Sequence, residues 1–210
     1  MGQIKHYNNG KWTIYTSGEG LSGYTGVTDT YYVGSDLDNN GNYSKANPDG
    51  SLVDLEKPFK RYLGEIYLEG IVFNIYLGED GLEHGHILYT GLTQTSLQNP
   101  TSQVSATSTW DGETNTGLYT NSLAKDWVYG LGGNWYIPAI DELNILYNNK
   151  YYINKTLDSI GITQLSTEYS IWSSTESGDS NAFTFSFTQG RTVPVNKTDT
   201  SIRVLAIKQF

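Results

Sequence analysis

The sequence predicts an α+β fold with one main core, on three observations. Gly, Asn, Ser, Thr and Tyr are abundant and only 17% of the 210 residues are charged, a composition that favours strands and turns over a helical bundle. One segment has helical periodicity, because Ile140, Leu143, Tyr147 and Tyr151 recur at spacings of three and four. The last third of the chain contains short alternating runs that are typical of strands.

Charge and cysteine content exclude several classes of function. A net charge of −9 without a cluster of Lys and Arg argues against binding to nucleic acid or to anionic membranes. The chain has no cysteine, which excludes disulfides, thiolate metal sites and a cysteine nucleophile. No apolar stretch approaches the length of a membrane span, and the first residues do not resemble a signal peptide. We therefore expect synthesis in a cytoplasm and no membrane insertion.

Residues 1–17 are expected to form an anchoring β-hairpin. The turn is Asn8-Asn9-Gly10, and Trp12 and Ile14 share one face of the second strand. Because an isolated two-stranded hairpin is marginal in water, we expect it to dock on another copy of the chain, on a different protein or on its own domain. An ordinary edge hairpin is the alternative.

Residues 18–60 are expected to form an acidic linker rich in Gly and Asn. Between residues 18 and 56, seven acidic residues outnumber the one lysine, Lys45. Asp36, Asp38 and Asn40 reproduce the opening of a calcium loop, but the twelfth position, which needs a bidentate Glu, is Asn47. We prefer the linker interpretation to a calcium site.

The first part of the following domain contains strands and a pair of histidines. Residues 66–77 read as one long strand, with Gly70 at a bulge or a close approach. His84 and His86 occupy alternate positions of the next strand, where two imidazoles facing the same way are able to bind a metal ion. No third ligand is evident, so we favour a pair of histidines without a metal.

The middle of the chain is expected to contain a long loop and two helices. Residues 90–120 form a polar tract that reads as a packed loop burying Trp110. A short helix over residues 123–129 is capped by Asn121 or Ser122. The main helix follows Pro138, with acidic residues in its first turn and Lys150 near its end.

Four strands are expected after the main helix, over residues 169–174, 182–188, 191–195 and 201–208. In the second of them, Phe183, Phe185 and Phe187 share one face. This face is expected to pack on the core.

Four sequence blocks together resemble a known family. They are Gly70-Ile-Val-Phe, Asn134-Trp-Tyr-Ile-Pro with Glu142-Leu143, Ile171-Trp-Ser-Ser-Thr-Glu176, and Ser201-Ile-Arg-Val-Leu-Ala-Ile. Over about residues 61–210 they resemble the bacterial and phage branch of the C-type-lectin fold, known as DUF1566 or Lcl domains. The resemblance implies a C-type-lectin-like head with antiparallel sheets and two main helices.

The blocks are expected to identify a fold more than a site. We interpret Trp135, Trp172, Glu142 and Arg203 as structural residues. The family commonly has Ser where this chain has Ala139, so the usual N-cap oxygen is missing, at a cost of about 1 kcal/mol. Glu142 is expected to reach back to the backbone there.

Relatives of this fold contact ligands between the Trp-Ser-Ser block and the last strand, which corresponds to residues 176–200. The resemblance therefore implies a ligand-binding surface made of polar loop residues, namely Glu176, Asp179, Asn181, Gln189, Arg191 and Asn196. The Glu-Pro-Asn and Trp-Asn-Asp motifs of calcium-dependent lectins do not occur, so neither a metal nor another cofactor is expected.

The residues do not indicate an enzyme. Formylglycine-generating enzymes have a related fold but depend on cysteines, which this chain lacks. Ser173 and Ser174 are conceivable nucleophiles, but none of the three histidines stands in a motif with them.

The expected order of an anchoring hairpin (residues 1–17), an acidic linker (18–60) and a lectin-like head (61–210) is typical of a tethered display protein. The composition, rich in Asn, Tyr and Ile, resembles virion proteins of crAss-like phages. We therefore expect a virion surface protein, assembled in the host cytoplasm, such as a head or tail fibre or a decoration protein. It would form a dimer or trimer, bind other virion proteins through its N-terminal segment, and contact host-surface carbohydrate or protein. A secreted or surface-anchored bacterial adhesin is the alternative, disfavoured by the missing export signal.

Overall fold

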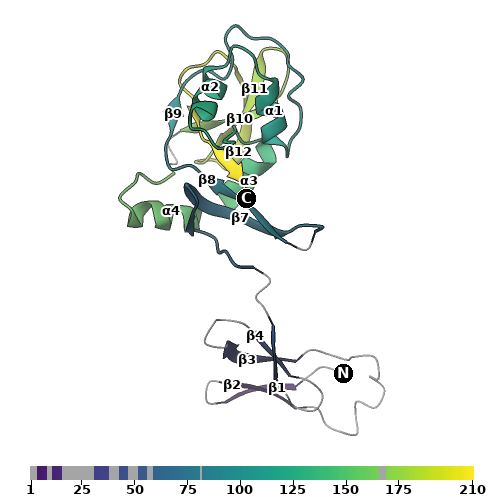
Figure 1. The fold of residues 1–210 in the computed structure, drawn as a ribbon. Coiled ribbons are helices and arrows are strands. Elements are labelled where there is room, and N and C mark those ends of the chain that lie inside the picture. Colours follow the sequence, from purple (N-terminus) through teal and green to yellow (C-terminus); the bar gives the residue numbers. More distant parts are fainter. Residues whose placement is uncertain are drawn as a thin grey trace. The chain divides into compact units, whose positions relative to one another are not determined.

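The computed structural model divides the chain into two compact units, Met1–Lys60 and Arg61–Phe210 (Figure 1). The structure describes residues 59–80, 82–165 and 169–210 in full. Before residue 59 it describes the backbone of five strands, which are β1 (Ile4–Asn8), β2 (Lys11–Tyr15), β3 (Tyr31–Leu37), β4 (Tyr43–Ala46) and β5 (Leu52–Leu55).

The first unit contains two small antiparallel sheets. β1 and β2 pair with Asn8 opposite Lys11, so the predicted hairpin is present. β3, β4 and β5 form a three-stranded sheet within residues 18–60, where the sequence predicted a linker. The physical reason for the difference is local, since runs such as Tyr31-Tyr32-Val33 carry strand-forming side chains within a segment whose average composition is that of a loop.

A four-stranded antiparallel sheet begins the second unit, in the order β14-β8-β7-β6. Its strands are β6 (Ile66–Tyr67), β7 (Gly70–Leu77), β8 (Glu83–Leu88) and β14 (Ile207–Gln209). The long strand expected over residues 66–77 is a tight hairpin instead, with Tyr67 opposite Gly70. The predicted close approach at Gly70 is present, because a Cβ there would lie 2.6 Å from the carbonyl oxygen of Leu88.

The second sheet of this unit has five strands in the order β12-β11-β10-β13-β9. β10 and β13 run parallel, and the other neighbours are antiparallel. The strands are β9 (Thr93–Gln94), β10 (Ser170–Glu176), β11 (Asn181–Ser186), β12 (Arg191–Asn196) and β13 (Arg203–Val204).

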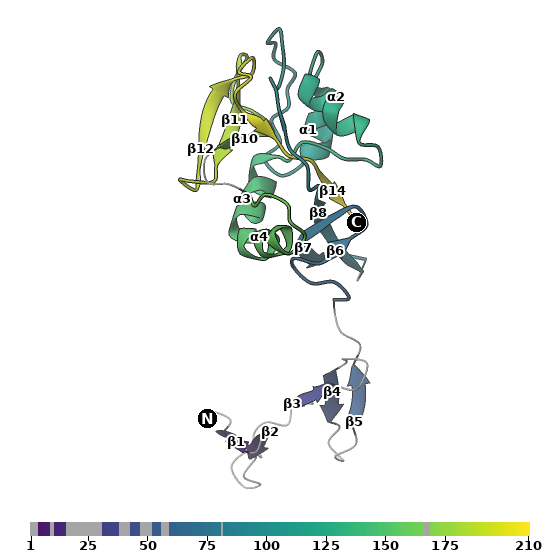
Figure 2. The same cartoon turned by 90° about the vertical axis from the view of Figure 1, so that its left-hand side faces the viewer.

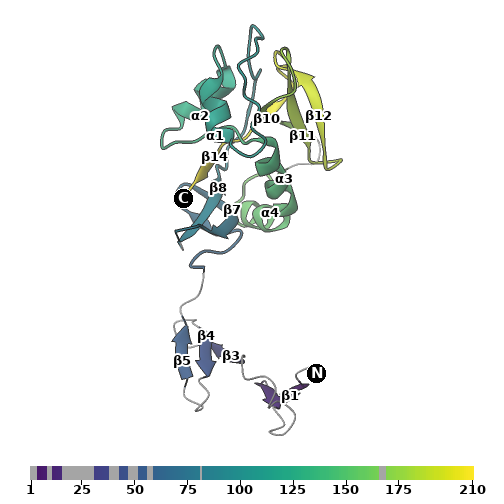
Figure 3. The ribbon, with the colours of Figure 1, turned by 90° about the vertical axis from the view of Figure 1, so that its right-hand side faces the viewer.

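Four helices occur in the described part of the chain, so the predicted α+β class is confirmed, with more helices than the two main ones expected. They are α1 (Gly112–Leu118), α2 (Leu123–Gly130), α3 (Ile140–Asn148) and α4 (Lys150–Ser159). Figure 2 and Figure 3 show α1 and α2 on one side of the second unit and strands β10, β11 and β12 on the other. α3 contacts strands of both sheets. None of the helices that the structure describes is long and apolar enough to cross a membrane.

The start of α3 is stabilised without a side-chain N-cap. Ala139 N–H donates to Glu142 Oε2 at 2.7 Å, as the sequence predicted. The next two free N–H groups donate to the Thr175 hydroxyl, at 3.2 Å, and to the Thr109 carbonyl, at 2.7 Å. Tertiary contacts therefore supply the acceptors that a Ser at this position would otherwise provide.

α3 ends sooner than the periodicity predicted. It stops at Asn148, and α4 begins at Lys150, after a break in the helix at Asn149. Tyr151 is consequently 68% exposed rather than on the inner face. α2 agrees with the prediction, because the Ser122 hydroxyl accepts from Lys125 N–H at 3.0 Å.

Two apolar clusters form the core of the second unit. Trp135 and Trp172 are fully buried in one cluster, and Phe185 and Phe187 belong to the other, as expected. Trp110 differs from its prediction: it is 73% exposed, because the loop before α1 packs through its backbone and small polar side chains.

Candidate functional site

The structure separates the predicted ligand-binding residues into two groups. In the hairpin of β11 and β12, Asn181 lies opposite Asn196 at one end, and Ser186 lies opposite Arg191 at the other. A strand of this length spans roughly 17 Å at about 3.4 Å per residue. The predicted residues of this hairpin therefore lie at its two ends and not next to one another. Asp179, Asn181 and Asn196, which are exposed at one end, are called the hairpin-end surface below.

Gln189 and Arg191 lie at the opposite end of the hairpin. Both side chains are exposed, and Arg191 Nε donates to Gln189 Oε1 at 2.5 Å. Part of the guanidinium is thus already engaged within the turn. These two residues serve below as a control position for the hairpin-end surface.

Glu176 does not lie on the surface, contrary to the prediction. Only 6% of the residue is exposed, and its carboxylate accepts from the N–H groups of Val104, at 3.1 and 3.3 Å, and Ala106, at 3.1 Å. It also forms an ion pair with the ammonium of Lys197. A buried carboxylate needs such partners to offset its lost hydration, and Glu176 is therefore a structural residue.

Lys197 is fully buried beneath the hairpin-end surface. Its Nζ also donates to the carbonyls of Ser102, at 2.7 Å, and Asp179, at 3.0 Å, and to Gln98 Oε1 at 3.3 Å. One ammonium thereby joins the loop before α1, the turn after β10 and the end of β12. The backbone that carries the exposed residues is held by buried interactions.

Tyr119 lies beside this ion pair. Burial of its phenol, together with the charge of Glu176, raises the pKa of Tyr119 above its ordinary value. Its hydroxyl donates to the Ser174 carbonyl at 3.1 Å. Tyr119 is therefore a neutral hydrogen-bond donor at physiological pH.

The candidate metal ligands have other partners. His84 Nε2 lies 3.0 Å from an Asp80 oxygen. His86 lies 3.1 Å from the Asn74 amide through Nδ1 and 3.5 Å from Glu142 Oε1 through Nε2. No group of three His, Asp or Glu residues in the described ranges is arranged to hold a metal ion.

The calcium-loop candidate falls largely beyond what the structure describes. Asp36 is part of β3, whose backbone alone is described. Asp38 and Asn40 lie outside the described residues. The interpretation that this loop is an acidic linker and not a calcium site stays a prediction.

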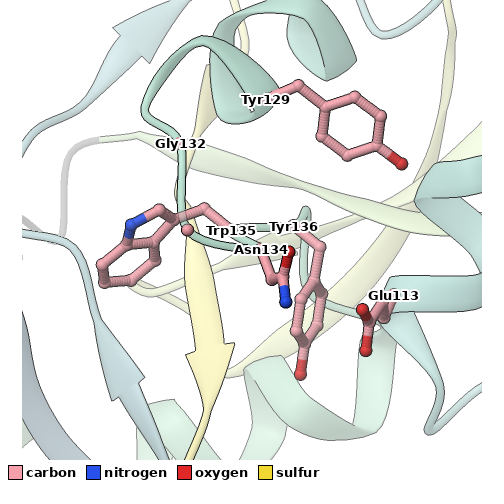
Figure 4. A pocket seen from close by; sticks show the side chains of 7 residues that line it. Glu113, Tyr129, Gly132, Asn134, Trp135 and Tyr136 are labelled. Atoms are coloured by element: carbon pink, nitrogen blue, oxygen red, sulfur yellow. The ribbon is translucent and has the colours of Figure 1, made fainter.

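A pocket of about 380 Å³ lies where α1, α2 and the segment before α3 meet, lined by Glu113, Tyr129 and residues 132–136. Figure 4 shows the ring of Tyr129 on one side, with Asn134, Tyr136 and Glu113 across from it. The Trp135 side chain points away from these groups and packs edge-on against Tyr89, with ring centroids 5.4 Å apart.

The floor and the rim of the pocket differ in their hydrogen bonding. Tyr136 is buried, and its hydroxyl donates to Glu142 Oε1 at 2.8 Å. Burial, and then the negative charge of Glu142, raise the pKa of Tyr136 above its ordinary value. At the rim, Glu113, Tyr129 and Asn134 are exposed, and within the described residues none of these three side chains makes a hydrogen bond.

Sequence reasoning did not identify this pocket. Its wall contains three consecutive residues with positive φ, namely Gly132 at 74°, Gly133 at 65° and Asn134 at 65°. These residues follow the end of α2 at Gly130. The signal that was missed is the Asn after two glycines, since Asn is the non-glycine residue that best tolerates this backbone region.

Comparisons with known proteins assign no family. No family model matches the sequence, and no curated protein does either. Among solved structures, a fimbrial protein from Bacteroides ovatus ATCC 8483 matches with a TM-score of 0.44 and 14% sequence identity. The match covers 87% of this chain and 48% of that one, so the chain spans about half the length of the fimbrial protein.

Proposed function

We propose that the chain is a non-enzymatic display protein of a phage virion, whose residues 61–210 form a C-type-lectin-like head that binds a ligand on the host surface. The observation that carries the proposal is the hairpin-end surface above the buried pair of Glu176 and Lys197. Asp179 and Asn181 expose side chains without hydrogen bonds in the described structure. A fixed backbone with free polar side chains loses little entropy when it binds a partner.

The lectin-like assignment is supported by where the resembling blocks lie. Trp135, Trp172 and Val204 come from three different blocks and meet in one buried cluster, together with Val72 from the fourth. Segments that are far apart in sequence therefore share a core, as expected of residues that specify a fold.

The non-enzymatic assignment is supported by the position of the conceivable nucleophiles. Ser173 and Ser174 have no exposed surface. A substrate has no access to their hydroxyls without movement of β10. The polar groups that do face solvent at the hairpin-end surface are amides and a carboxylate, which suit recognition.

Mass spectrometry of purified phage particles and of cell-free culture supernatant tests the assignment. If the chain is a virion protein, it will be found in the particle fraction, and its ratio to the major capsid protein will stay constant through successive density gradients. Recovery in the supernatant or on bacterial cells, with none in particles, would instead identify the bacterial adhesin that is the alternative.

A further inference from the structure

We propose that the pocket between α1, α2 and residues 132–136 binds one neutral sugar ring of a surface glycan. This inference rests on the proposed function and deepens it, because it names a ligand class and a site distinct from the hairpin-end surface. The pocket volume of about 380 Å³ lies at the small end of the range for ligand sites, which is about 300–1,000 Å³. One pyranose ring and a few waters fit that space.

The aromatic side of the pocket suits the apolar face of a sugar. Tyr129 is half-exposed, and its ring lies over the pocket (Figure 4). The C–H groups on one face of a pyranose are apolar and flat enough to pack on such a ring, and tyrosine combines this contact with a free hydroxyl. Tyr136 adds a buried aromatic floor.

The polar side suits hydroxyl groups. Glu113 offers two acceptor oxygens, and Asn134 offers one acceptor and two donors. Neither side chain has a hydrogen-bond partner among the described residues. Neighbouring hydroxyls of a sugar each donate and accept, so a carboxylate next to an amide is able to bind them in pairs without leaving a donor unused.

The charges around the pocket argue against an ionic ligand. A cation would meet two lysines: Lys208 Nζ lies 3.4 Å from the position that a Cβ would take at Gly133, and Lys125 Nζ lies 5.3 Å from the centre of the Tyr129 ring. An anion would meet the carboxylate of Glu113. A neutral polyhydroxylated ring avoids both repulsions.

The wall that carries Asn134 is fixed before any ligand binds. Tyr136 exchanges two backbone hydrogen bonds with Ile207, at 2.9 and 3.0 Å. Gly132 and Gly133 adopt positive φ, which most other residues would disfavour. A preformed wall reduces the ordering cost of binding. For a single sugar we still expect a Kd on the order of 1 mM, given the few atoms involved.

Saturation-transfer NMR on the full chain tests the inference, with the methyl glycosides of glucose, galactose, mannose and N-acetylglucosamine as probes. We expect transfer to the ring protons of at least one glycoside. Tyr129→Ala and Glu113→Gln should each weaken that binding at least tenfold. Matched controls are Asp126→Asn, an exposed carboxylate on α2, and Tyr151→Ala, an exposed ring on α4. Both should bind like the parent.

Several results would overturn the inference. They are transfer to none of the glycosides, binding unchanged in a folded Tyr129→Ala variant, and displacement of the glycoside by tetramethylammonium at equal concentration. Attachment of the parent protein to cells is measured separately. If cells bind the protein while no glycoside does, the pocket inference fails and the proposed function stands. If a glycoside binds through Tyr129 but no cell surface retains the protein, the proposed function fails and the pocket assignment stands.

Discussion

The carboxylate of Glu176 and the ammonium of Lys197 form a buried ion pair, although 21 residues separate them in sequence. The pair holds three loops beneath the hairpin-end surface. Removing one partner leaves the other charge buried without compensation, which is costly. We predict that Lys197→Met lowers the free energy of unfolding by about 3–5 kcal/mol, measured by urea denaturation.

The double variant is the control for this prediction. Glu176→Gln with Lys197→Met removes both charges and keeps an acceptor for the N–H groups of Val104 and Ala106. The double variant should therefore be more stable than Lys197→Met alone. Strictly additive losses would show that the two side chains do not interact.

Trp172 should be essential to folding. Its ring is fully buried, and its Nε1 donates to the Thr95 carbonyl at 2.9 Å. Trp172→Ala should cost about 3–5 kcal/mol, because it creates a cavity and leaves an acceptor unpaired. The exposed Trp110 is the matched control, and Trp110→Ala should change the melting temperature little. Equal effects of the two substitutions would contradict the assigned core.

Alkaline pH should destabilise the protein through Tyr119 and Tyr136. Burial raises the pKa of both phenols in the folded state above the value of about 10 that they have when unfolded. Above pH 10 the unfolded chain loses these protons while the folded chain keeps them. The contribution of these two phenols to the free energy of unfolding is therefore fully present below about pH 10. It falls as pH rises, by up to about 1.4 kcal/mol per pH unit for each tyrosine.

Variants separate these two tyrosines from the other titrating groups. Tyr136→Phe removes one buried phenol, so unfolding followed by circular dichroism should show a shallower loss of stability above pH 10. Tyr151→Phe, at an exposed position, should keep the parental slope. The same slope in all three proteins would contradict the predicted linkage.

The N-terminal hairpin should be required for assembly but not for folding of the second unit. Residues 61–210 form a compact unit with their own core. Deleting residues 1–17 should leave the thermal unfolding of that core unchanged. The predicted homo-oligomer should become a monomer in analytical ultracentrifugation. An unchanged oligomer and unchanged incorporation into virions would reject the anchoring role.

Local signals predicted much of the fold. The helix after Pro138, the cap at Ser122 and the inward face of Phe185 depend on spacing of three, four or two residues, which a sequence displays directly. The break between α3 and α4 was not predictable in this way, because tertiary packing decides it. The sequence continues the apolar spacing up to Tyr151, but the chain turns at Asn149, whose amide donates to the Phe73 carbonyl at 2.9 Å.

The candidate sites were less predictable, since they depend on distant contacts. Glu176 is the last residue of β10, but the predicted strand ended at residue 174 and so placed Glu176 in a loop. Nothing near it in the sequence indicates Lys197 as its partner. The split of the predicted surface had a visible signal, because a turn at Gly190 places Arg191 at the far end of a hairpin from Asp179. The pocket brings together Glu113, Tyr129 and Asn134 from three segments, and no short pattern connects them.

The most direct test of the proposed binding head is attachment to intact bacterial cells, measured by cosedimentation of the full chain. Asp179→Ala with Asn181→Ala should weaken attachment at least tenfold while the melting temperature stays near that of the parent. Gln189→Ala with Arg191→Ala, at the other end of the hairpin, should attach like the parent, and EDTA should have no effect. Attachment that survives the first double substitution, or that is lost with the second or with EDTA, would contradict the assignment of the binding surface.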